Sequence, residues 1–585
     1  MVQQWIVETT PHQGLSFYTR ANIGEVFPDP VSPMSFSWFE HGGTIGGAEI
    51  GFRNAYYRIG VMTPDELPPD KAVFLGVTNG YGYLNASALR LLGHRAPGMT
   101  YKDIDDAFFG DAPGVPDFKP QPGDDRPDLA QKIGGTFQWV LTTPDLPDVA
   151  AHQVMVNKLR QKRPDFTAMS DRELVDYFWE LMDAHFADLF TEHIFISFLA
   201  TLPIGIITKV CEAVGRPDAI LRLLAGLGDV ESAAPSMEMW KLGRMVAASP
   251  DLSSLFDEGP TGLNAKLLAS ESPDVRSFTF EFDEFLEAYG SRGPNEWEAR
   301  SPTWETAPDL ALAAIDRMRL SPLSASPADH NADLASEREQ LGGEIAAMVE
   351  GDPETHGQFL AALNSAKVFM PGRERTKTNC IKLIHEVRMA LQEWGRRCVD
   401  AGSFPFLNSY GLLTRDEIEE FMADPAPFRA ILQQREDHFN EISTLQEPFL
   451  FDGIAPPIDE YPRRDAVETV DLTTGETLQG LPGCPGSARG IARVITDSFD
   501  PGALAPGEIL IAPLTDPSWT PLFVPAAAVV VDVGAPLSHA IIVSRELGVP
   551  CVVSATDATR RIPDGALIDV SGDTGEITII ELPSA

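Results

Sequence analysis

One histidine of this chain has neighbours that suit it to carry a phosphoryl group. Ser538 precedes His539, and apolar residues follow at helical spacing as far as Leu547-Gly548. An apolar strand, residues 528–533, leads through a Gly- and Pro-containing turn to the serine. His539 is therefore expected in the first turn of a helix, where the helix dipole and unpaired backbone N–H groups favour negative charge on the imidazole. These features predict a nucleophilic His539, with Ser538 binding phosphate oxygens.

Charged side chains elsewhere could serve the same chemistry. Phosphoryl transfer needs cations for the phosphoryl oxygens, a base for the proton of the acceptor and, in many enzymes, magnesium. Arg292 and Glu296 are expected to act as a catalytic cation and base. Arg373 and Lys377 are candidate phosphate-binding cations, and Glu374 is a candidate metal ligand. Each of these residues could instead belong to a helix-surface ion pair.

The composition is that of a globular protein with an acidic surface. Among 585 residues, 45 Lys and Arg face 85 Asp and Glu, so the net charge is −40. This balance argues against nucleic acid or an anionic membrane as a partner. No signal peptide is recognisable, and apolar runs such as Ile194 to Ile207 are interpreted as too short and interrupted to span a bilayer. With five scattered cysteines and no C-x-x-C, we expect a reduced, cytoplasmic protein.

Periodicity divides the chain into three regions. Residues 1–455 begin as an α/β segment, become mainly helical and are expected to bind the acceptor. Residues 456–478 are a Pro-containing linker, and residues 479–585 form a compact α/β module of short strands around one clear helix. The expected fold class is multidomain α+β. Helices are predicted at 171–190, 219–227, 278–289, 333–348, 353–365, 374–401 and 414–442, and strands at 72–78, 490–495, 508–513, 528–533, 551–554, 566–570 and 576–580.

The segment around His539 resembles the phosphohistidine motif of the phosphoenolpyruvate-utilising enzymes. The matching residues are Gly534, Ser538, His539, Ala540, Ile542, Val543, Arg545, Glu546, Gly548, Val549 and Pro550, and the departures are Ala535, Ile541 and Ser544. Four other segments are similar to the rifampicin phosphotransferase-like members of this family: 20–34, 285–298, 372–377 and 515–523. The resemblance covers nearly the whole chain in outline. It implies that residues 479–585 are a mobile, swivelling β/β/α domain that is phosphorylated on His539.

The resemblance also has gaps that shape the expected activity. Ser291 stands where the family has His and Thr303 where it has Arg, so the acid–base and phosphate-binding roles of those two positions are in question. Full-length relatives begin with an ATP-grasp domain, and we recognise no convincing nucleotide site in this sequence. The resemblance therefore implies that a separately encoded ATP-grasp protein binds ATP and Mg²⁺, in a split arrangement similar to that of phenylphosphate synthase.

The activity implied is that of a dikinase-type phosphotransferase. His539 would carry phosphoryl from ATP to a bulky or aromatic alcohol, and ATP would end as AMP and phosphate. Two alternatives stay open. One is a phosphoenolpyruvate synthase-like enzyme, which is less favoured because no segment resembles the phosphoenolpyruvate-binding barrel. The other is a non-catalytic ligand-binding or regulatory relic, against which the retained Ser538-His539 motif argues.

Overall fold

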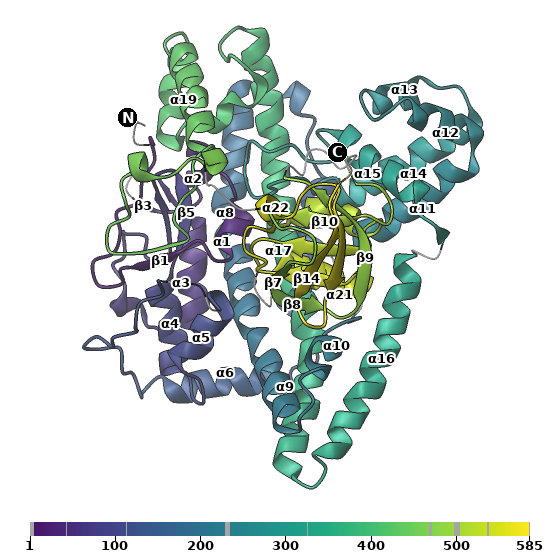
Figure 1. Cartoon of the computed structure of the whole chain (residues 1–585). Coiled ribbons are helices and arrows are strands. Elements are labelled where there is room, and N and C mark those ends of the chain that lie inside the picture. Colours follow the sequence, from purple (N-terminus) through teal and green to yellow (C-terminus); the bar gives the residue numbers. More distant parts are fainter. Residues whose placement is uncertain are drawn as a thin grey trace. The chain divides into compact units, whose positions relative to one another are not determined.

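The computed structural model describes residues 5–41, 44–110, 112, 114–227, 234–323, 326–466, 471–496, 504–534 and 538–583 (Figure 1). The chain forms two compact units. The first comprises residues 1–200, 297–301 and 375–467, and the second comprises 201–296, 302–374 and 468–585. The region 1–455 is thus divided between the units, and the C-terminal sheet shares a unit with helices from the middle of the chain.

An antiparallel sheet of four strands lies in the first unit, in the order β4-β5-β1-β6. Its strands are β1 (Phe17–Thr19), β4 (Leu75–Thr78), β5 (Tyr81–Asn85) and β6 (Leu450–Asp452). A tight turn joins β4 to β5 through Asn79 and Gly80, whose φ angles are 51° and 88°. Positive φ at both positions is typical of the Asn-Gly turns that match the twist of a hairpin. A separate two-stranded sheet pairs β2 (Glu40–His41) with β3 (Thr44–Ile45).

Helices α3 (Gly47–Ile59) and α8 (Asp171–Leu199) pack together in the first unit. The approach is close at Gly51, where an added Cβ would lie 2.9 Å from Cδ1 of Phe190. The N-cap residue Ser170 accepts a hydrogen bond from the backbone of Glu173, which completes a capping box. The other helices of this unit are α1 (Ile23–Val26), α2 (Pro33–Phe36), α4 (Ala86–Arg95), α5 (Tyr101–Phe108), α6 (Ala130–Thr142), α7 (Pro147–Gln161), α18 (Ile418–Ala423) and α19 (Phe428–Ile442).

Helix α17 (Pro353–Asp400) contributes residues to both units. The sequence predicted two helices, 353–365 and 374–401, but the structure has one helix that continues through Pro371. Proline lacks the N–H of one helical hydrogen bond and usually kinks a helix, although packing on neighbouring elements can hold the helix together. The single helix predicted at 414–442 is instead divided into a short 3₁₀ turn, α18 and α19, with Pro425 and Pro427 at the interruption. The capping box at Thr414 is confirmed.

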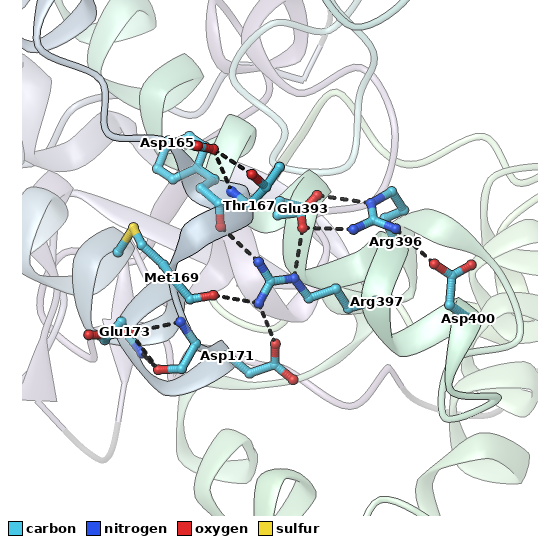
Figure 2. Close-up of polar contacts among 11 residues, drawn as sticks. Asp165, Thr167, Met169, Asp171, Glu173, Glu393, Arg396, Arg397 and Asp400 are labelled. Carbon is cyan, nitrogen blue, oxygen red and sulfur yellow. Dashed lines mark hydrogen bonds and ion pairs between the residues drawn. The ribbon is translucent and has the colours of Figure 1, made fainter.

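Polar contacts tie the C-terminal end of α17 to the segment that precedes α8 (Figure 2). Arg397 donates from Nη1 to the carbonyl of Met169 at 2.6 Å and from Nη2 to that of Phe166 at 2.7 Å. Its Nε donates to Glu393 at 2.7 Å, and Arg396 donates to the same carboxylate. Hydrogen bonds from Arg396 and then Arg397 lower the pKa of Glu393 to about 2. This network fixes the two segments of the first unit against each other.

One helical stretch, Asp171–Ala213, is long and apolar enough to cross a membrane by length and composition alone. Its most apolar window has a mean hydropathy of 2.0, and half of that window is buried. Runs such as Ile194 to Ile207 were expected to be too short, whereas the helical stretch that contains them is long enough by length and composition. A single stretch of this kind is weak evidence for a membrane span, since core helices share the property.

The second unit contains a mixed sheet of eight strands in the order β7-β14-β13-β9-β10-β11-β12-β8. The run from β9 to β12 is parallel, and the other pairs are antiparallel. The strands are β7 (Thr477–Gln479), β8 (Leu481–Cys484), β9 (Ser487–Val494), β10 (Ile509–Ala512), β11 (Ala528–Val531), β12 (Cys551–Val553), β13 (Leu567–Ser571) and β14 (Glu576–Glu581). The six strands predicted after residue 489 are confirmed to within a few residues, whereas β7 and β8 were missed.

Helices of the second unit share a hydrophobic core with this sheet. Short helix α20 (Thr520–Phe523) contacts α11 (Ala234–Ala248) and α15 (Pro308–Leu320). Trp519 and Phe523 are buried in the same cluster as residues of α11 and α15. The unit's other helices are α9 (Thr201–Ala213), α10 (Ala219–Leu223), α12 (Pro250–Asp257), α13 (Leu263–Ala269), α14 (Pro273–Tyr289), α16 (Pro327–Met348), α21 (His539–Leu547) and α22 (Ala558–Arg561). The structure is thus mostly helical with a mixed sheet near its C-terminus.

Candidate functional site

His539 is the first residue of helix α21, as the sequence predicted. Ser538 is the N-cap residue, with extended backbone angles of φ −66° and ψ 156°. Gly548 ends the helix in the left-handed conformation at φ 68°, a conformation that glycine adopts without strain. Strand β11 precedes this segment and β12 follows it. The strand–helix–strand arrangement therefore places the imidazole at the positive end of the helix dipole.

Both ring nitrogens of His539 lie at hydrogen-bond distance from threonine hydroxyls. Thr515 Oγ1 is 3.1 Å from Nδ1, and Thr520 Oγ1 is 3.0 Å from Nε2. The ring of Phe523 lies edge-on with a centroid separation of 6.0 Å, and His539 is only 7% exposed. A neutral imidazole has one N–H and one lone pair, so one threonine accepts a hydrogen bond while the other donates to the lone pair. The ring is held on both sides.

Ser538 is buried, and its hydroxyl has no hydrogen-bond partner among the described residues. It does not cap its own helix, although its carbonyl accepts from the N–H of Ile542 at 3.1 Å. The serine hydroxyl is therefore not committed to a structural contact. Its role in phosphate binding stays a prediction. Ala535, where the motif departs from the family pattern, lies outside the described residues.

Asp516 connects the loop that holds His539 to a second segment. Its Oδ2 accepts the backbone N–H of Asn295 at 3.0 Å, and its Oδ1 accepts the N–H of Ser518 at 2.7 Å. Burial raises the pKa of Asp516, its hydrogen bonds oppose that rise, and the nearby Glu296 carboxylate adds to it. Thr515 and Thr520, at the two ends of the loop 515–520, therefore hold the imidazole, and Asp516 anchors this loop to the segment at Asn295.

Arg292 and Glu296, predicted as a cation and a base, come together as a buried ion pair. Nη1 of Arg292 lies 3.0 Å from Oε1 and 3.2 Å from Oε2 of Glu296, and both side chains are almost fully enclosed. Ser291 and Thr303, which depart from the family pattern, are buried in the same segment. Asn295 links this segment to Asp516, so the predicted pair belongs to the chain of contacts that ends at His539. The catalytic roles of the pair stay a prediction.

Arg373, Glu374 and Lys377 all lie on α17. Glu374 is buried, and the two cations, one helical turn apart, are partly exposed. Across the described ranges there is no group of three or more His, Cys, Asp or Glu side chains placed to hold a metal ion. The assignment of Glu374 to a metal, like those of Arg373 and Lys377 to phosphate, stays a prediction.

Thr515, Asp516 and Thr520 were missed as individual site residues. They lie in Thr515-Asp-Pro-Ser-Trp-Thr-Pro-Leu-Phe523, a segment already noted for its family resemblance. That resemblance was the available signal, because nothing in local spacing shows that residues 19 and 24 positions before His539 hold its ring.

Comparison with known proteins matches two regions of this chain to described domains. Residues 192–374 match the rifampicin phosphotransferase fourth domain, and residues 504–575 match the PEP-utilising enzyme mobile domain, which contains His539. An uncharacterised protein of Mycobacterium tuberculosis is 32% identical over 375 residues, covering 63% of this chain and 39% of that protein. The prodigiosin synthesizing transferase of Serratia marcescens is 25% identical over 612 residues, covering 96% and 63%.

A rifampicin phosphotransferase of Streptomyces sviceus is 30% identical over 305 residues, covering 51% of this chain and 34% of that enzyme. The chain spans less than two thirds of the length of each of these relatives. The two matched domains and the motif at His539 support one conclusion. Residues 504–575 form a PEP-utilising enzyme mobile domain, and the chain resembles the phosphoenolpyruvate-utilising enzymes, among them the rifampicin phosphotransferases.

Proposed function

We propose that this protein is a phosphotransferase in which His539 carries a phosphoryl group from ATP to a hydroxyl acceptor. The observation that carries the proposal is the position of His539 at the start of α21, buried and oriented by Thr515 and Thr520. The relatives named rifampicin phosphotransferase support the same class of reaction. The helix dipole would stabilise a phosphorylated imidazole by about 0.3–1 kcal/mol, and by more in a buried site.

In the first half-reaction, the lone pair of the His539 imidazole attacks a phosphorus atom of ATP. The nitrogen–phosphorus bond forms at the β-phosphorus while the bond from that phosphorus to the α-phosphate oxygen breaks, so AMP leaves. Water then cleaves the bond between the β- and γ-phosphates, which releases inorganic phosphate and leaves one phosphoryl group on His539. The Ser538 hydroxyl and the first-turn N–H groups of α21 then bind phosphoryl oxygens. Neutral imidazole is required, and it is abundant near pH 7 because its ordinary pKa is about 6.5.

In the second half-reaction, the acceptor hydroxyl attacks the phosphohistidine. The oxygen–phosphorus bond forms, the nitrogen–phosphorus bond breaks, and the hydroxyl proton passes to a base, for which Glu296 is our candidate. Arg292, Arg373 and Lys377 are the candidate cations for the phosphoryl oxygens. Overall, ATP, water and the acceptor alcohol give AMP, inorganic phosphate and the phosphorylated acceptor.

We propose that an ATP-grasp domain carried by a separate polypeptide supplies the ATP site. Magnesium would then enter as the ATP complex, and we derive no step through a metal held by this chain. The acceptor is proposed to be a bulky or aromatic alcohol. The rifampicin phosphotransferase relatives support this class.

The test is acid-labile phosphate on His539, measured by intact mass at neutral pH. The chain is incubated with Mg-ATP, alone and with an ATP-grasp protein from the same genome, and His539→Ala is the control. We expect labelling only with the partner and none in the variant. Labelling by the chain alone would place the ATP site within it. An unchanged label on His539→Ala, or no label with a demonstrably active partner, would contradict the proposal and favour a non-catalytic binding protein.

A further inference from the structure

Thr515 and Thr520 close the histidine site by flanking the ring of His539. Thr520 Oγ1 lies 3.0 Å from Nε2 of His539, and Thr515 Oγ1 lies 3.1 Å from Nδ1. Whichever nitrogen is unprotonated, its lone pair meets a threonine hydroxyl. That lone pair is the nucleophile of the proposed reaction, and it cannot form a bond to phosphorus while it accepts a hydrogen bond. The threonine must therefore withdraw before the imidazole reacts.

Thr520 belongs to an element that is fixed by packing. It opens α20, which contacts α11 and α15, and its own side chain is fully buried. The neighbouring Trp519 is 4% exposed and Phe523 is fully buried in the core shared with those helices. Thr520 is consequently held beside Nε2 for as long as α20 stays packed against the helices.

Two carboxylates, one in the loop 515–520 and one in α21, accept hydrogen bonds from the helical part of the same unit. Asp516 accepts the backbone N–H of Asn295 at 3.0 Å, and Glu546 of α21 accepts that of Leu227 at 3.1 Å. Both carboxylates are buried, so water does not compete for these hydrogen bonds. Bonds between charged acceptors and backbone donors are among the stronger hydrogen bonds in proteins.

We propose that Nε2 is the reactive nitrogen of His539, that Asp516 is a positioning residue that latches the loop 515–520 to the segment at Asn295, and that Thr520 thereby caps Nε2 until the latch opens. This inference rests on the proposed function of His539, but it concerns the resting geometry alone. In the closed arrangement the imidazole is shielded from adventitious phosphoryl donors and from water. Opening of the latch at Asp516 frees α20 and, with it, the hydroxyl at Nε2.

The experiment measures the reactivity of His539 in the full chain without ATP, partner or acceptor. Diethyl pyrocarbonate modifies neutral imidazole nitrogens, and peptide mass spectrometry at pH 7.5 gives the rate at His539 relative to His356 in the same sample. Removal of the cap in Thr520→Ala should raise the relative rate about fivefold or more, as expected when one buried hydrogen bond is lost. Thr520→Ser keeps the hydroxyl and should react as slowly as the wild type.

The latch is tested by Asp516→Ala, with Asp569→Ala as the matched control. Asp569 pairs with Arg489 on an exposed face of the sheet and makes no contact with the loop 515–520 in the hydrogen bonds described. We expect Asp516→Ala to raise the rate at His539 and to increase hydrogen exchange at the amide of Asn295 about tenfold. Thr520→Ala should leave that amide protected, and Asp569→Ala should change neither quantity.

Rates at His539 within twofold of the wild type in both Thr520→Ala and Asp516→Ala, each folded by circular dichroism, would overturn the proposal. If Asp516→Ala does not fold, the comparison of Thr520→Ala with Thr520→Ser decides the cap, and the variant Glu546→Gln tests the second carboxylate. Because no phosphoryl donor is present, this result is independent of the labelling experiment on His539. A failed latch would leave the phosphotransferase proposal intact, and the converse also holds.

Discussion

Nη1 of Arg292 lies 3.0 Å from Oε1 of Glu296, and the two side chains are 3% and 1% exposed. A pair this deeply enclosed has given up its hydration, so each charge depends on the other. Asn295, between them in sequence, donates its backbone N–H to Asp516 in the loop that holds His539. The ion pair therefore supports the site through the backbone as well as through its own charges.

Removal of either charge should destabilise the protein strongly. Arg292→Met is expected to lower the free energy of unfolding by about 3–5 kcal/mol, because the buried Glu296 then loses the cation 3.0 Å from its carboxylate. The double variant Arg292→Met with Glu296→Leu should lose much less than the sum of the single losses. Urea denaturation of the second unit's transition measures both. Additive losses would show that the two charges do not depend on each other.

Two glycine-to-alanine changes, one where α3 packs on α8 and one in α6, should have opposite effects on stability. At Gly51 a new Cβ would meet Cδ1 of Phe190 at 2.9 Å and the backbone N of Thr191 at 3.0 Å, so Gly51→Ala should destabilise the first unit by about 1–3 kcal/mol. Gly134 lies in α6, where an added Cβ would meet no atom within 4 Å. Gly134→Ala should stabilise that unit by about 0.4–1 kcal/mol. Thermal melts of both variants provide the comparison.

Asp532 predicts a pH dependence of stability. Burial raises its pKa to about 6, although the hydroxyl and N–H of Thr559 donate to its carboxylate and oppose the rise. The native state therefore binds more protons than the unfolded state between about pH 4 and pH 6. The free energy of unfolding should fall as pH rises through that window, by about 1–2 kcal/mol after discounting for partial exposure. Asp532→Asn should flatten the slope, and an unchanged slope would assign it to other groups.

The two arginines of the network in Figure 2, Arg397 and Arg396, should contribute differently to stability. Arg397→Ala removes two hydrogen bonds to backbone carbonyls and one to Glu393, and should cost about 2 kcal/mol. Arg396 has a side chain 55% exposed and bonds only to carboxylates in the contacts described, so Arg396→Ala should cost less than about 1 kcal/mol. Chemical denaturation at pH 7 compares them, and equal losses would contradict the distinction.

The same network should respond to acid. The pKa of Glu393 is lowered to about 2 by Arg396 and then Arg397, so its contribution to stability is complete above the ordinary carboxyl pKa near 4.5. That contribution is lost as pH falls toward about 2. Glu393→Gln should therefore weaken the loss of stability between about pH 4.5 and pH 2. A denaturation series over that range checks the direction.

Local sequence was sufficient to predict the helix that begins at His539. Its N-cap Ser538, apolar spacing and terminal Gly548 are encoded within a dozen residues. The same holds for strand β11 before it. By contrast, the contacts of Thr515, Thr520 and Asp516 join loops whose separation is set by tertiary packing, so their types alone could not reveal them.

Two local sequence signals, one for a hairpin and one for a helix break, differ in how far the structure follows them. Asn79-Gly80 is a strong hairpin signal, and it joins β4 to β5 with positive φ at both residues. Pro371 argues for a helix break, but the packing along α17 outweighs one lost hydrogen bond. Arg292 and Glu296 could be recognised from the sequence as charged candidates. Their pairing with each other depends on the turn that brings residues 292 and 296 together, which the sequence did not predict.

The aromatic packing of α20 has a thermal consequence for turnover. Movement of the segment 515–523, which contains α20, away from α11 and α15 would expose Trp519, Leu522 and Phe523 to water. Hydration of apolar surface raises the heat capacity. Release of the segment should therefore be an activated step whose enthalpy grows with temperature. A curved Arrhenius plot for phosphorylation of His539, straightened when Trp519 is replaced by a smaller side chain, would be its signature.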